Sequence, residues 1–344
     1  MAKRPLLTLS CLLLPVVALA AGARPRDAFD TSRPDIIAFA SEVAPRVGMT
    51  HAQILALLGQ ARSQKSILEA MSRPAERSVP WYDYRARFLS EARLSGGVAF
   101  WREHRAELER VSAARGVPAE YLVAIIGVET LYGRQTGRYR VLDALATLSF
   151  DFPPRAPYFR GELENFLMMA QAGEVDALAA TGSYAGAMGA PQFMPSSFRN
   201  FAVDETGDGR RDLWRDWPDV FASIANYFIA HGWRTGEPVM VECSGHNAAD
   251  DPLDTTVTLN DTVAKLRQRG YRFDAPLPAD APAVLVPAEL PEAMSWRIGF
   301  RNWYVITRYN RSPLYAMAVH DLATALRARI SEQPATLPAA GPAS

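Results

Sequence analysis

Glu129 is the acidic residue whose neighbours in the sequence best suit acid/base chemistry. It follows an apolar run that starts at Tyr121, and this run predicts a helix. Residues three, four and seven positions apart share one face of a helix, so Glu129 lies in line with Leu122, Ile125 and Ile126. Partial removal of a carboxyl group from water favours its protonated form, which a general acid needs at neutral pH. The pattern therefore predicts that Glu129 can protonate a glycosidic oxygen.

Residues 182–197 form a second segment with features of a ligand site. The segment is rich in glycine and alanine, which allow the backbone to approach a ligand closely. Gln192 offers amide donors and an acceptor for N-acetyl groups and sugar hydroxyls, and Phe193 can form an apolar floor. The structural alternative is a packed turn followed by a helix N-cap at Ser196.

A third cluster, residues 302–315, places aromatic side chains beside asparagine and arginine. It reads Asn-Trp-Tyr-Val-Ile-Thr-Arg-Tyr-Asn-Arg-Ser-Pro-Leu-Tyr. These side chains suit the faces and the hydroxyls of sugars. On composition alone, the cluster fits a buried strand and a turn equally well, and residues 303–306 predict a strand.

The elements that must position these residues are mostly helices. Residues 35–149 have largely helical periodicity, and further helices are predicted at 121–131, 162–171, 221–230 and 316–330. The texture changes between residues 239 and 298, where short strands are predicted among Pro, Asp and Gly. These strands are predicted at 239–241, 256–259 and 283–286. The sequence therefore predicts a mainly α fold with a small β-containing insertion.

The first residues are typical of an export signal. Lys3 and Arg4 precede a short apolar run at 6–18, and small residues precede Ala21, where we expect cleavage. Cys11 lies inside the apolar run and not at its end, which disfavours a lipoprotein signal. The sequence therefore predicts a periplasmic protein, with association with the outer membrane left open.

Composition excludes several classes of function. The 344 residues carry a formal net charge of +0, which provides no basic field for nucleic acid. After removal of the signal only Cys243 remains, so no internal disulfide and no cysteine zinc cluster can form. No organic cofactor is expected, and binding of a neutral or mixed-charge polymer remains open.

Three motifs together resemble the membrane-bound lytic murein transglycosylase B family of peptidoglycan lytic transglycosylases. They are Gly-Val-Glu-Thr and Tyr-Gly around Glu129, Gly-Ala-Met-Gly with Gln-Phe-Met-Pro-Ser-Ser within 182–197, and Trp-Tyr-Val-Ile-Thr-Arg-Tyr-Asn at 303–310. The resemblance spans about residues 35–330, the expected catalytic domain. It implies a lysozyme-like helical core, an added N-terminal α segment and the small β-containing insertion.

The domain boundaries follow from this resemblance and from composition. The core is expected at about 95–235 and 299–330, and the insertion at about 239–298. A signal peptide at 1–20, a flexible lead-in at 21–34 and a disordered tail at 331–344 complete the chain.

The resemblance also implies the reaction. It is non-hydrolytic cleavage of the MurNAc–GlcNAc β-1,4 bond in peptidoglycan glycan strands, which leaves 1,6-anhydromuramoyl ends during remodelling and turnover of the cell wall. Glu129 is the single catalytic residue that it implies, and we expect a monomer. Several residues are expected to lie around the substrate, from the resemblance and from the composition of residues 182–197. They are Ser183, Gln192, Phe193, Tyr304, Tyr309, Asn310, Arg155 and Tyr158. The family often has paired arginines where this chain has Pro154-Arg155, so contacts with the peptide stem are less well defined.

Residues 204–212 contain the beginning of a calcium-binding pattern. Oxygen-bearing side chains alternate along it, and Gly209 stands at the position where an EF-hand loop turns sharply. The usual glutamate at position 12 is replaced by Arg215. With the family resemblance, the expected ligands are Asp204, Thr206, Asp208, the backbone carbonyl of Arg210, and Asp219. The alternative is an acidic surface turn capped by its own side chains.

Three alternatives stay open at this point. Glu129 could be a structural glutamate paired with Arg134 or Arg138, since buried ion pairs also perturb carboxylates. The chain could be a hydrolytic muramidase that uses Glu129 together with Glu162 or Asp151. It could also be a peptidoglycan-binding protein without enzymatic activity. Protein partners in cell-wall synthesis are not readable from the sequence.

Overall fold

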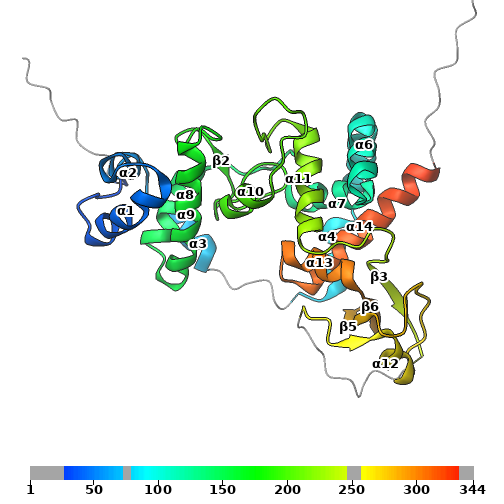
Figure 1. Cartoon of the computed structure of the whole chain (residues 1–344). Helices are drawn as coiled ribbons and strands as arrows, with labels where there is room; N and C mark the ends of the chain where they lie inside the picture. The colour runs from blue at the N-terminus through cyan, green and yellow to red at the C-terminus, as the bar shows by residue number, and fades with distance from the viewer. Residues whose placement is uncertain (1–26, 73–78, 246–256, 333–344) are drawn as a thin grey trace, which may run out of the picture.

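The computed structural model describes residues 27–72, 79–245 and 257–332, and this part of the chain is mainly α-helical, as predicted. Figure 1 shows one group of helices at the left end of the molecule, a second group to its right and the small sheet at the lower right. The helices at the N-terminal end are α1 (Pro34–Val47), α2 (His51–Leu58), α3 (Lys65–Ser72), α8 (Val141–Phe150) and α9 (Ala156–Gln171). A short 3-10 turn, η1 (Pro153–Arg155), joins α8 to α9.

The N-terminal group is more extensive than the sequence predicted. The flexible lead-in was expected to reach residue 34, but residues 27–33 pack against the fold. Phe29 is buried and lies edge-on to Phe150, with 6.0 Å between ring centroids. Arg33 forms ion pairs with Asp35 at 2.8 Å and with Asp151 at 2.7 Å. Burial of one aromatic ring and pairing of one arginine order this segment, and neither produces a periodic signal.

The second group of helices surrounds α7 (Ala119–Thr130). Nearly every residue of α7 is buried, because α14 (Pro313–Glu332), α5 (Glu91–Glu103), α6 (Arg105–Arg115) and α11 (Trp217–Ala230) pack around it. The apolar stripe of Leu122, Ile125 and Ile126 is therefore part of a helix that is enclosed on all sides. The other helices here are α4 (Trp81–Phe88) and α13 (Arg301–Tyr309). The helix α10 (Pro195–Phe201) packs on both α9 and α11, and the two-stranded pair β1 (Tyr139–Arg140) and β2 (Thr181–Gly182) adjoins α8.

The β-containing insertion is confirmed as a distinct sheet with its own apolar cluster. Its strands are β3 (Met240–Cys243), β4 (Asp261–Thr262), β5 (Pro282–Glu289) and β6 (Met294–Gly299), all antiparallel, in the order β3-β6-β5-β4. A short helix, α12 (Val263–Gln268), buries Val263 and Leu266 with Leu285 and Ile298 of the sheet. The alternate residues Val284 and Val286 of β5 join the main core. The sheet thus ties the insertion to the helices.

Two predicted strands were wrong. Residues 303–306 lie in the helix α13, because the buried residues Asn302, Trp303, Val305 and Ile306 form one helical face, and packing overrides the β propensity of this run. Of the strand predicted at 256–259, residue 256 lies outside the described residues, and residues 257–259 form no strand.

The remaining predictions concern the chain ends. The expected signal peptide lies outside the described residues, as does most of the expected tail, although residues 331–332 end α14. Among the described helices, none is by itself long and apolar enough to cross a membrane, while the bent pair α6 and α7 meets the length and composition test together.

Candidate active site

Glu129 stands in the last turn of α7, directly before an unusual backbone stretch. Leu131 and Tyr132 have φ angles of 51° and 61°, and Gly133 follows at 78°. The left-handed region is costly for residues with a side chain and persists where the surroundings enforce it. Thr130 helps to enforce it, because its hydroxyl donates to the carbonyl of Ala190 at 2.9 Å and accepts from the N–H of Gly133 at 3.1 Å. The helix end is therefore fixed against residues 182–197.

Among the described residues, Tyr315 is the hydrogen-bond partner of the Glu129 carboxyl group. The hydroxyl of Tyr315 in α14 donates to Oε1 of Glu129 at 2.5 Å. Burial raises the pKa of Glu129 from 4.5 to about 7, although the hydrogen bond from Tyr315 lowers it. The alternative that Glu129 is a structural glutamate paired with Arg134 or Arg138 is wrong, because no arginine of the described chain pairs with this carboxyl group. Near neutral pH, Glu129 can therefore both give and take a proton.

Tyr309 joins Glu129 to a cluster of aromatic rings. Burial, and then the charge of Glu129, raises the pKa of Tyr309 far above its ordinary value. Its hydroxyl donates to the carbonyl of Pro191 at 2.7 Å. Its ring lies 5.9 Å from Phe193 and 4.8 Å from Tyr227 between centroids. Two of the predicted residues, Tyr309 and Phe193, thus lie together beside the catalytic candidate.

Ser183 and Gln192 shape the loop between them. The Ser183 hydroxyl oxygen accepts from the backbone N–H groups of Ala185 and Ala187 at 3.3 and 3.1 Å. Gln192 has a left-handed backbone with φ of 53°, and its Nε2 donates to the carbonyls of Thr136 and Gly189, each at 3.0 Å. The two N–H donors of the Gln192 side chain are therefore used within the loop, and its Oε1 is the atom suited to a sugar.

Gly182 is required where residues 182–197 begin. A Cβ atom on Gly182 would lie 2.2 Å from the carbonyl oxygen of Ala187, a backbone atom that cannot move aside. The small residues noted in the sequence therefore allow the backbone to pack on itself at this point.

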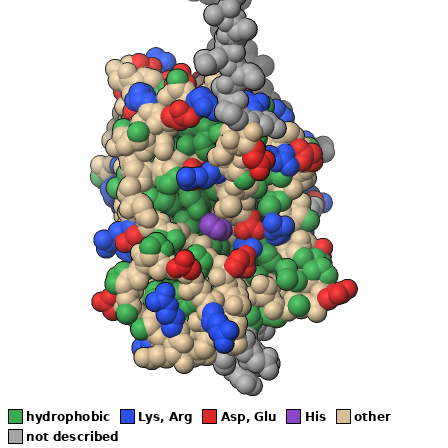
Figure 2. Space-filling view, turned by 90° about the vertical axis from the view of Figure 1, so that its right-hand side faces the viewer, with side chains coloured by type: hydrophobic (Ala, Val, Ile, Leu, Met, Phe, Trp, Pro, Cys, Tyr) green, Lys and Arg blue, Asp and Glu red, His purple; other side chains and the backbone are tan. Residues whose placement is uncertain are grey.

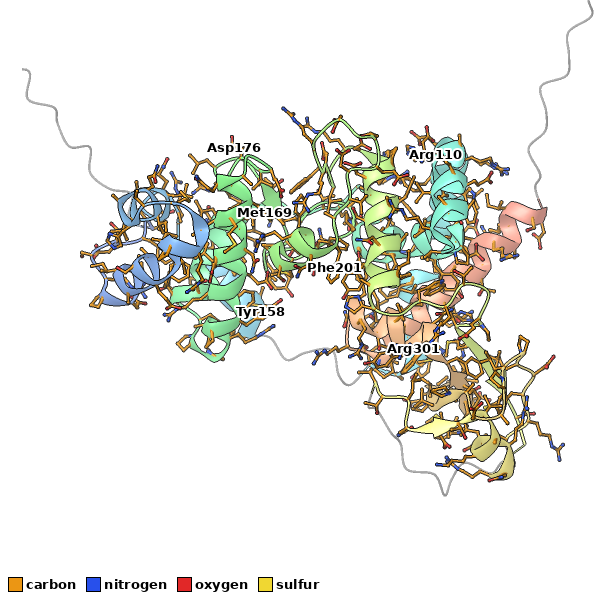
Figure 3. The ribbon with its side chains drawn as sticks, in the orientation of Figure 1. Arg110, Tyr158, Met169, Asp176, Phe201 and Arg301 are labelled. Atoms are coloured by element: carbon orange, nitrogen blue, oxygen red, sulfur yellow. The ribbon has the colours of Figure 1, made fainter. Side chains whose placement is uncertain are left out.

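Arg155 and Tyr158 lie on the N-terminal side of the site. The Arg155 guanidinium group lies over the ring of Tyr158, 4.6 Å from its centroid. Tyr158 is 44% exposed. Figure 3 shows Tyr158 on α9 and Arg301 on α13 to either side of Phe201.

Tyr304 and Asn310 lie on α13 and at its end. The guanidinium groups of Arg301 and Arg308 lie over the Tyr304 ring, at 5.5 and 4.2 Å from its centroid. Asn310 is exposed and follows the last residue of the helix. In the described structure neither side chain hydrogen-bonds to Glu129, so their contacts with substrate stay a prediction.

The other candidate carboxylates have structural partners. Glu162 accepts from the backbone N–H of Ser196 at 2.9 Å and from its hydroxyl at 2.7 Å, and so caps α10. The N-cap at Ser196, considered as the structural alternative, is not found, because α10 starts at Pro195 and its N-cap is Met194. Asp151 pairs with Arg33 and accepts from the hydroxyl of Ser63 at 2.6 Å.

The predicted calcium loop turns at Gly209, as expected, with φ of 85°. Asp204 accepts from the N–H groups of residues 207, 208 and 209, and buried Asp219 accepts from those of Glu205 and Asp212 at 2.7 and 2.9 Å. The atoms expected to bind the metal are all oxygen atoms, which suits calcium chemically. Among the described residues, however, no group of three or more His, Cys, Asp and Glu side chains is arranged to hold a metal ion.

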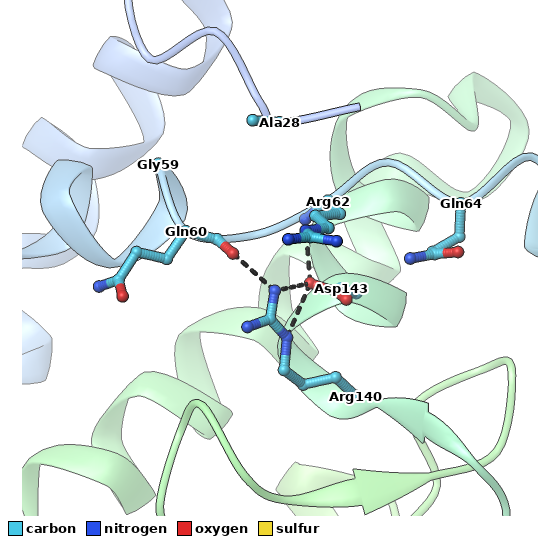
Figure 4. A pocket seen from close by; sticks show the side chains of 7 residues that line it. All are labelled: Ala28, Gly59, Gln60, Arg62, Gln64, Arg140 and Asp143. Atoms are coloured by element: carbon cyan, nitrogen blue, oxygen red, sulfur yellow. Dashed lines mark hydrogen bonds and ion pairs between the residues drawn. The ribbon is translucent and has the colours of Figure 1, made fainter. Parts of the chain in front are cut away.

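A polar hollow of about 530 Å³ lies elsewhere, against the N-terminal helices (Figure 4). Arg140 crosses it, donating to Oδ1 of Asp143 at 3.0 and 2.5 Å and to the carbonyl of Gln60 at 2.6 Å. The backbone N–H of Arg62 donates to the same Oδ1 at 2.9 Å. None of the predicted site residues lines this hollow, whose hydrogen bonds hold the N-terminal segment to α8.

Comparison with known proteins gives a consistent set of relatives. The family model described as Transglycosylase SLT domain matches residues 31–324. The membrane-bound lytic murein transglycosylase B of Escherichia coli K12 is 39% identical over 304 residues, which cover 86% of this chain and 83% of the relative.

Solved structures agree with this match. The soluble lytic transglycosylase SltB1 from Pseudomonas aeruginosa has a TM-score of 0.81 and 47% identity, covering 86% of this chain and 99% of that one. E. coli Slt35 in complex with calcium has a TM-score of 0.80 and 39% identity, covering 88% and 96%. P. aeruginosa SltB3 in complex with NAG-anhNAM-pentapeptide has a TM-score of 0.75 and 31% identity, covering 84% and 78%.

Proposed function

The chain belongs to the SLT-domain family of lytic murein transglycosylases, and we propose that Glu129 alone carries the proton transfers of its reaction. The fold is lysozyme-like, and the activity is that of a lyase acting on peptidoglycan. The observation that carries the proposal is the state of Glu129, whose half-buried carboxyl group accepts a hydrogen bond from Tyr315 and has its pKa raised to about 7.

The reaction needs one proton delivered and one removed. Glu129 first protonates the oxygen that links C1 of MurNAc to GlcNAc, and the C1–O bond breaks because the leaving group departs as an alcohol. The muramoyl 6-hydroxyl then closes onto C1, and the ionised Glu129 accepts its proton. A 1,6-anhydromuramoyl end forms, no water is consumed, and the enzyme returns to its starting protonation state. The muramoyl N-acetyl group stabilises the cationic centre.

The surrounding residues hold the sugar and transfer no proton. Ser183 and Gln192 keep the loop of residues 182–197 in place, and Oε1 of Gln192 accepts from a hydroxyl or an acetamide N–H. Phe193 supports the ring of Tyr309, and Tyr304 and Asn310 contact the strand from α13. Arg155 and Tyr158 contact the peptide stem.

A hydrolytic muramidase would need a second carboxylate, and Glu162 gives the sharpest test of that alternative. We expect Glu162→Gln to lower stability by about 1–2 kcal/mol, because a charge-assisted hydrogen bond to α10 is weakened. The variant should still release anhydromuramoyl fragments. Glu164→Gln is the matched control, because Glu164 lies on the same helix and pairs with Arg46 near the surface. A folded Glu162→Gln protein that no longer cleaves sacculi would make Glu162 a second catalytic group.

Calcium is proposed to bind the loop through Asp204, Thr206, Asp208, the carbonyl of Arg210, and Asp219, and to steady it. Support comes from the all-oxygen donor set, the turn at Gly209 and the calcium complex of Slt35. A metal that binds only the folded protein raises its Tm as its concentration exceeds the Kd. Millimolar calcium should therefore raise Tm in the parent protein and have no effect on Asp208→Ala. An unchanged melting curve in the parent would leave the segment a plain acidic turn.

We place the protein in the periplasm, with cleavage of the signal before Ala21. The export signal and the peptidoglycan substrate support this location, and N-terminal sequencing of the mature protein tests it. A lipid-modified Cys11 would contradict it. Figure 2 shows acidic and basic side chains interspersed on one face, which gives that face no continuous basic field for nucleic acid.

A further inference from the structure

Arg308 and Arg311 bring two positive charges to the end of α13. The Arg308 guanidinium group donates to the carbonyl of Val257 at 3.3 Å and to the hydroxyl of Thr307 at 3.0 Å, and it lies over the ring of Tyr304. Its Nε is buried without a hydrogen-bond partner. Arg311 follows the helix and is exposed. Arg308 thus places a fixed cation at the end of α13.

Neither arginine is neutralised by a carboxylate in the ranges that the structure describes. Other arginines of this half are neutralised in this way: Arg297 pairs with Asp321 at 2.7 Å, and Arg327 pairs with Glu120 at 2.7 Å. A half-buried cation without a partner is costly, and an anion that arrives with a ligand removes that cost. The pair is therefore suited to an anionic group from outside the chain.

The two arginines lie beside the catalytic cluster. The carbonyl of Arg308 accepts from the hydroxyl of Tyr227 at 2.7 Å, and the ring of Tyr227 lies 4.8 Å from that of Tyr309 between centroids. The pKa of Tyr309 is in turn raised by the charge of Glu129, after the larger effect of burial. Burial raises the pKa of Tyr227 to about 12, while the charges of Arg308 and Arg311 lower it and that of Tyr158 raises it. The hydrogen bond from Tyr227 thus ties the end of α13 to the aromatic cluster, and Figure 3 shows Tyr158 on α9, across from α13.

We propose that Arg308 and Arg311 form a subsite for the carboxylate groups of the peptide stem on the muramoyl residue. The inference rests on the proposed function. A glycan strand whose muramoyl lactyl groups are amide-linked to peptides is itself neutral, so its carboxylates belong to the stem. A guanidinium group binds a carboxylate through two parallel N–H donors, a geometry that lysine does not reproduce. Arg308 supplies the oriented donors, and Arg311 supplies exposed charge that attracts the stem. The subsite selects stem-bearing strands.

The test compares two forms of one substrate. Glycan strands with N-acetylated stems are used either unmodified or after conversion of the stem carboxylates to carboxamides with a carbodiimide and ammonia. Anhydromuramoyl products are then counted for the full-length parent, Arg311→Gln, Arg308→Lys and the double variant Arg308→Gln/Arg311→Gln. Arg267→Gln is the control, because it removes the same charge from α12 in the insertion.

The parent should show a KM about 10-fold higher for amidated strands, with kcat little changed, since lost ground-state binding raises KM alone. Arg311→Gln and Arg308→Lys should raise KM about threefold for unmodified strands only. The double variant should treat both substrates alike, and Arg267→Gln should match the parent. The inference would be overturned if the parent had equal KM values for the two substrates. It would also be overturned if the variants raised KM equally for unmodified and amidated strands. Absence of any anhydromuramoyl product from the parent would instead refute the proposed function.

Discussion

Glu129→Gln is expected to remain folded, to bind glycan strands and to lose nearly all cleavage. Glutamine keeps the size of the side chain and can still accept the hydrogen bond of Tyr315, but it has no proton to deliver. General acid/base groups contribute about 10²–10⁴-fold, and a residue that serves both steps belongs at or above the upper end. The measurement is the rate of anhydromuramoyl release from purified sacculi, beside the melting temperature of the variant.

The result needs a comparison that separates chemistry from positioning. Tyr309→Phe keeps the ring within its aromatic cluster and removes only the hydroxyl that donates to Pro191. It should lower activity partially, because it loosens a positioning contact and leaves the proton donor in place. Near-normal product formation by a folded Glu129→Gln protein would contradict the assignment of Glu129.

The second large effect is a pH dependence of stability that belongs to Glu129. Its pKa rises from 4.5 to about 7 on folding, so between these values the folded protein binds more protons than the unfolded chain. The contribution to stability is fully present below about pH 4.5 and is lost as the pH rises through about 7. Such a shift corresponds to about 3 kcal/mol. Glu129→Gln does not titrate, so its stability relative to the parent should increase across this window.

Chemical denaturation of the two proteins at several pH values measures this difference. Tyr315→Phe adds a directional check, because the hydrogen bond from Tyr315 lowers the pKa of Glu129. Without that bond the window should extend to higher pH. The cleavage rate of the parent should fall in the same range above about pH 7, as the acid form is lost. Parallel stability curves for the parent and Glu129→Gln would show that the carboxyl group has an ordinary pKa.

The sequence predicted the helix of Glu129 well and its immediate partner poorly. The long apolar run ending at Glu129 predicts a buried helix, and α7 spans almost the predicted residues. Tyr315 is 186 residues further along the chain, and no local pattern indicates that α14 turns this hydroxyl toward Glu129. The hydrogen bond between Glu162 and the backbone N–H of Ser196 was missed for the same reason. The two residues lie on different helices and are 34 positions apart in the sequence.

The strand predicted at residues 303–306 failed for a different reason. A run of aromatic and β-branched residues has strand propensity, but α13 is anchored by Asn302, whose side chain bonds to the backbone of Arg234 and Glu237. Tertiary anchoring of this kind decides the conformation of a short segment over its intrinsic preference. The short strand β6 and the helix α12 have weak periodic signals and emerge only through their pairing and shared apolar cluster.

The central claim is that one carboxyl group cleaves the glycan without water. Digestion of purified sacculi in ¹⁸O-labelled water, followed by mass spectrometry of the released fragments, tests it most directly. We predict that the parent releases muramoyl ends that are lighter than the hydrolysis product by one water and carry no label, and that Glu129→Gln releases almost none. Reducing muramoyl ends carrying ¹⁸O at C1 would show that water is the nucleophile and would contradict the account.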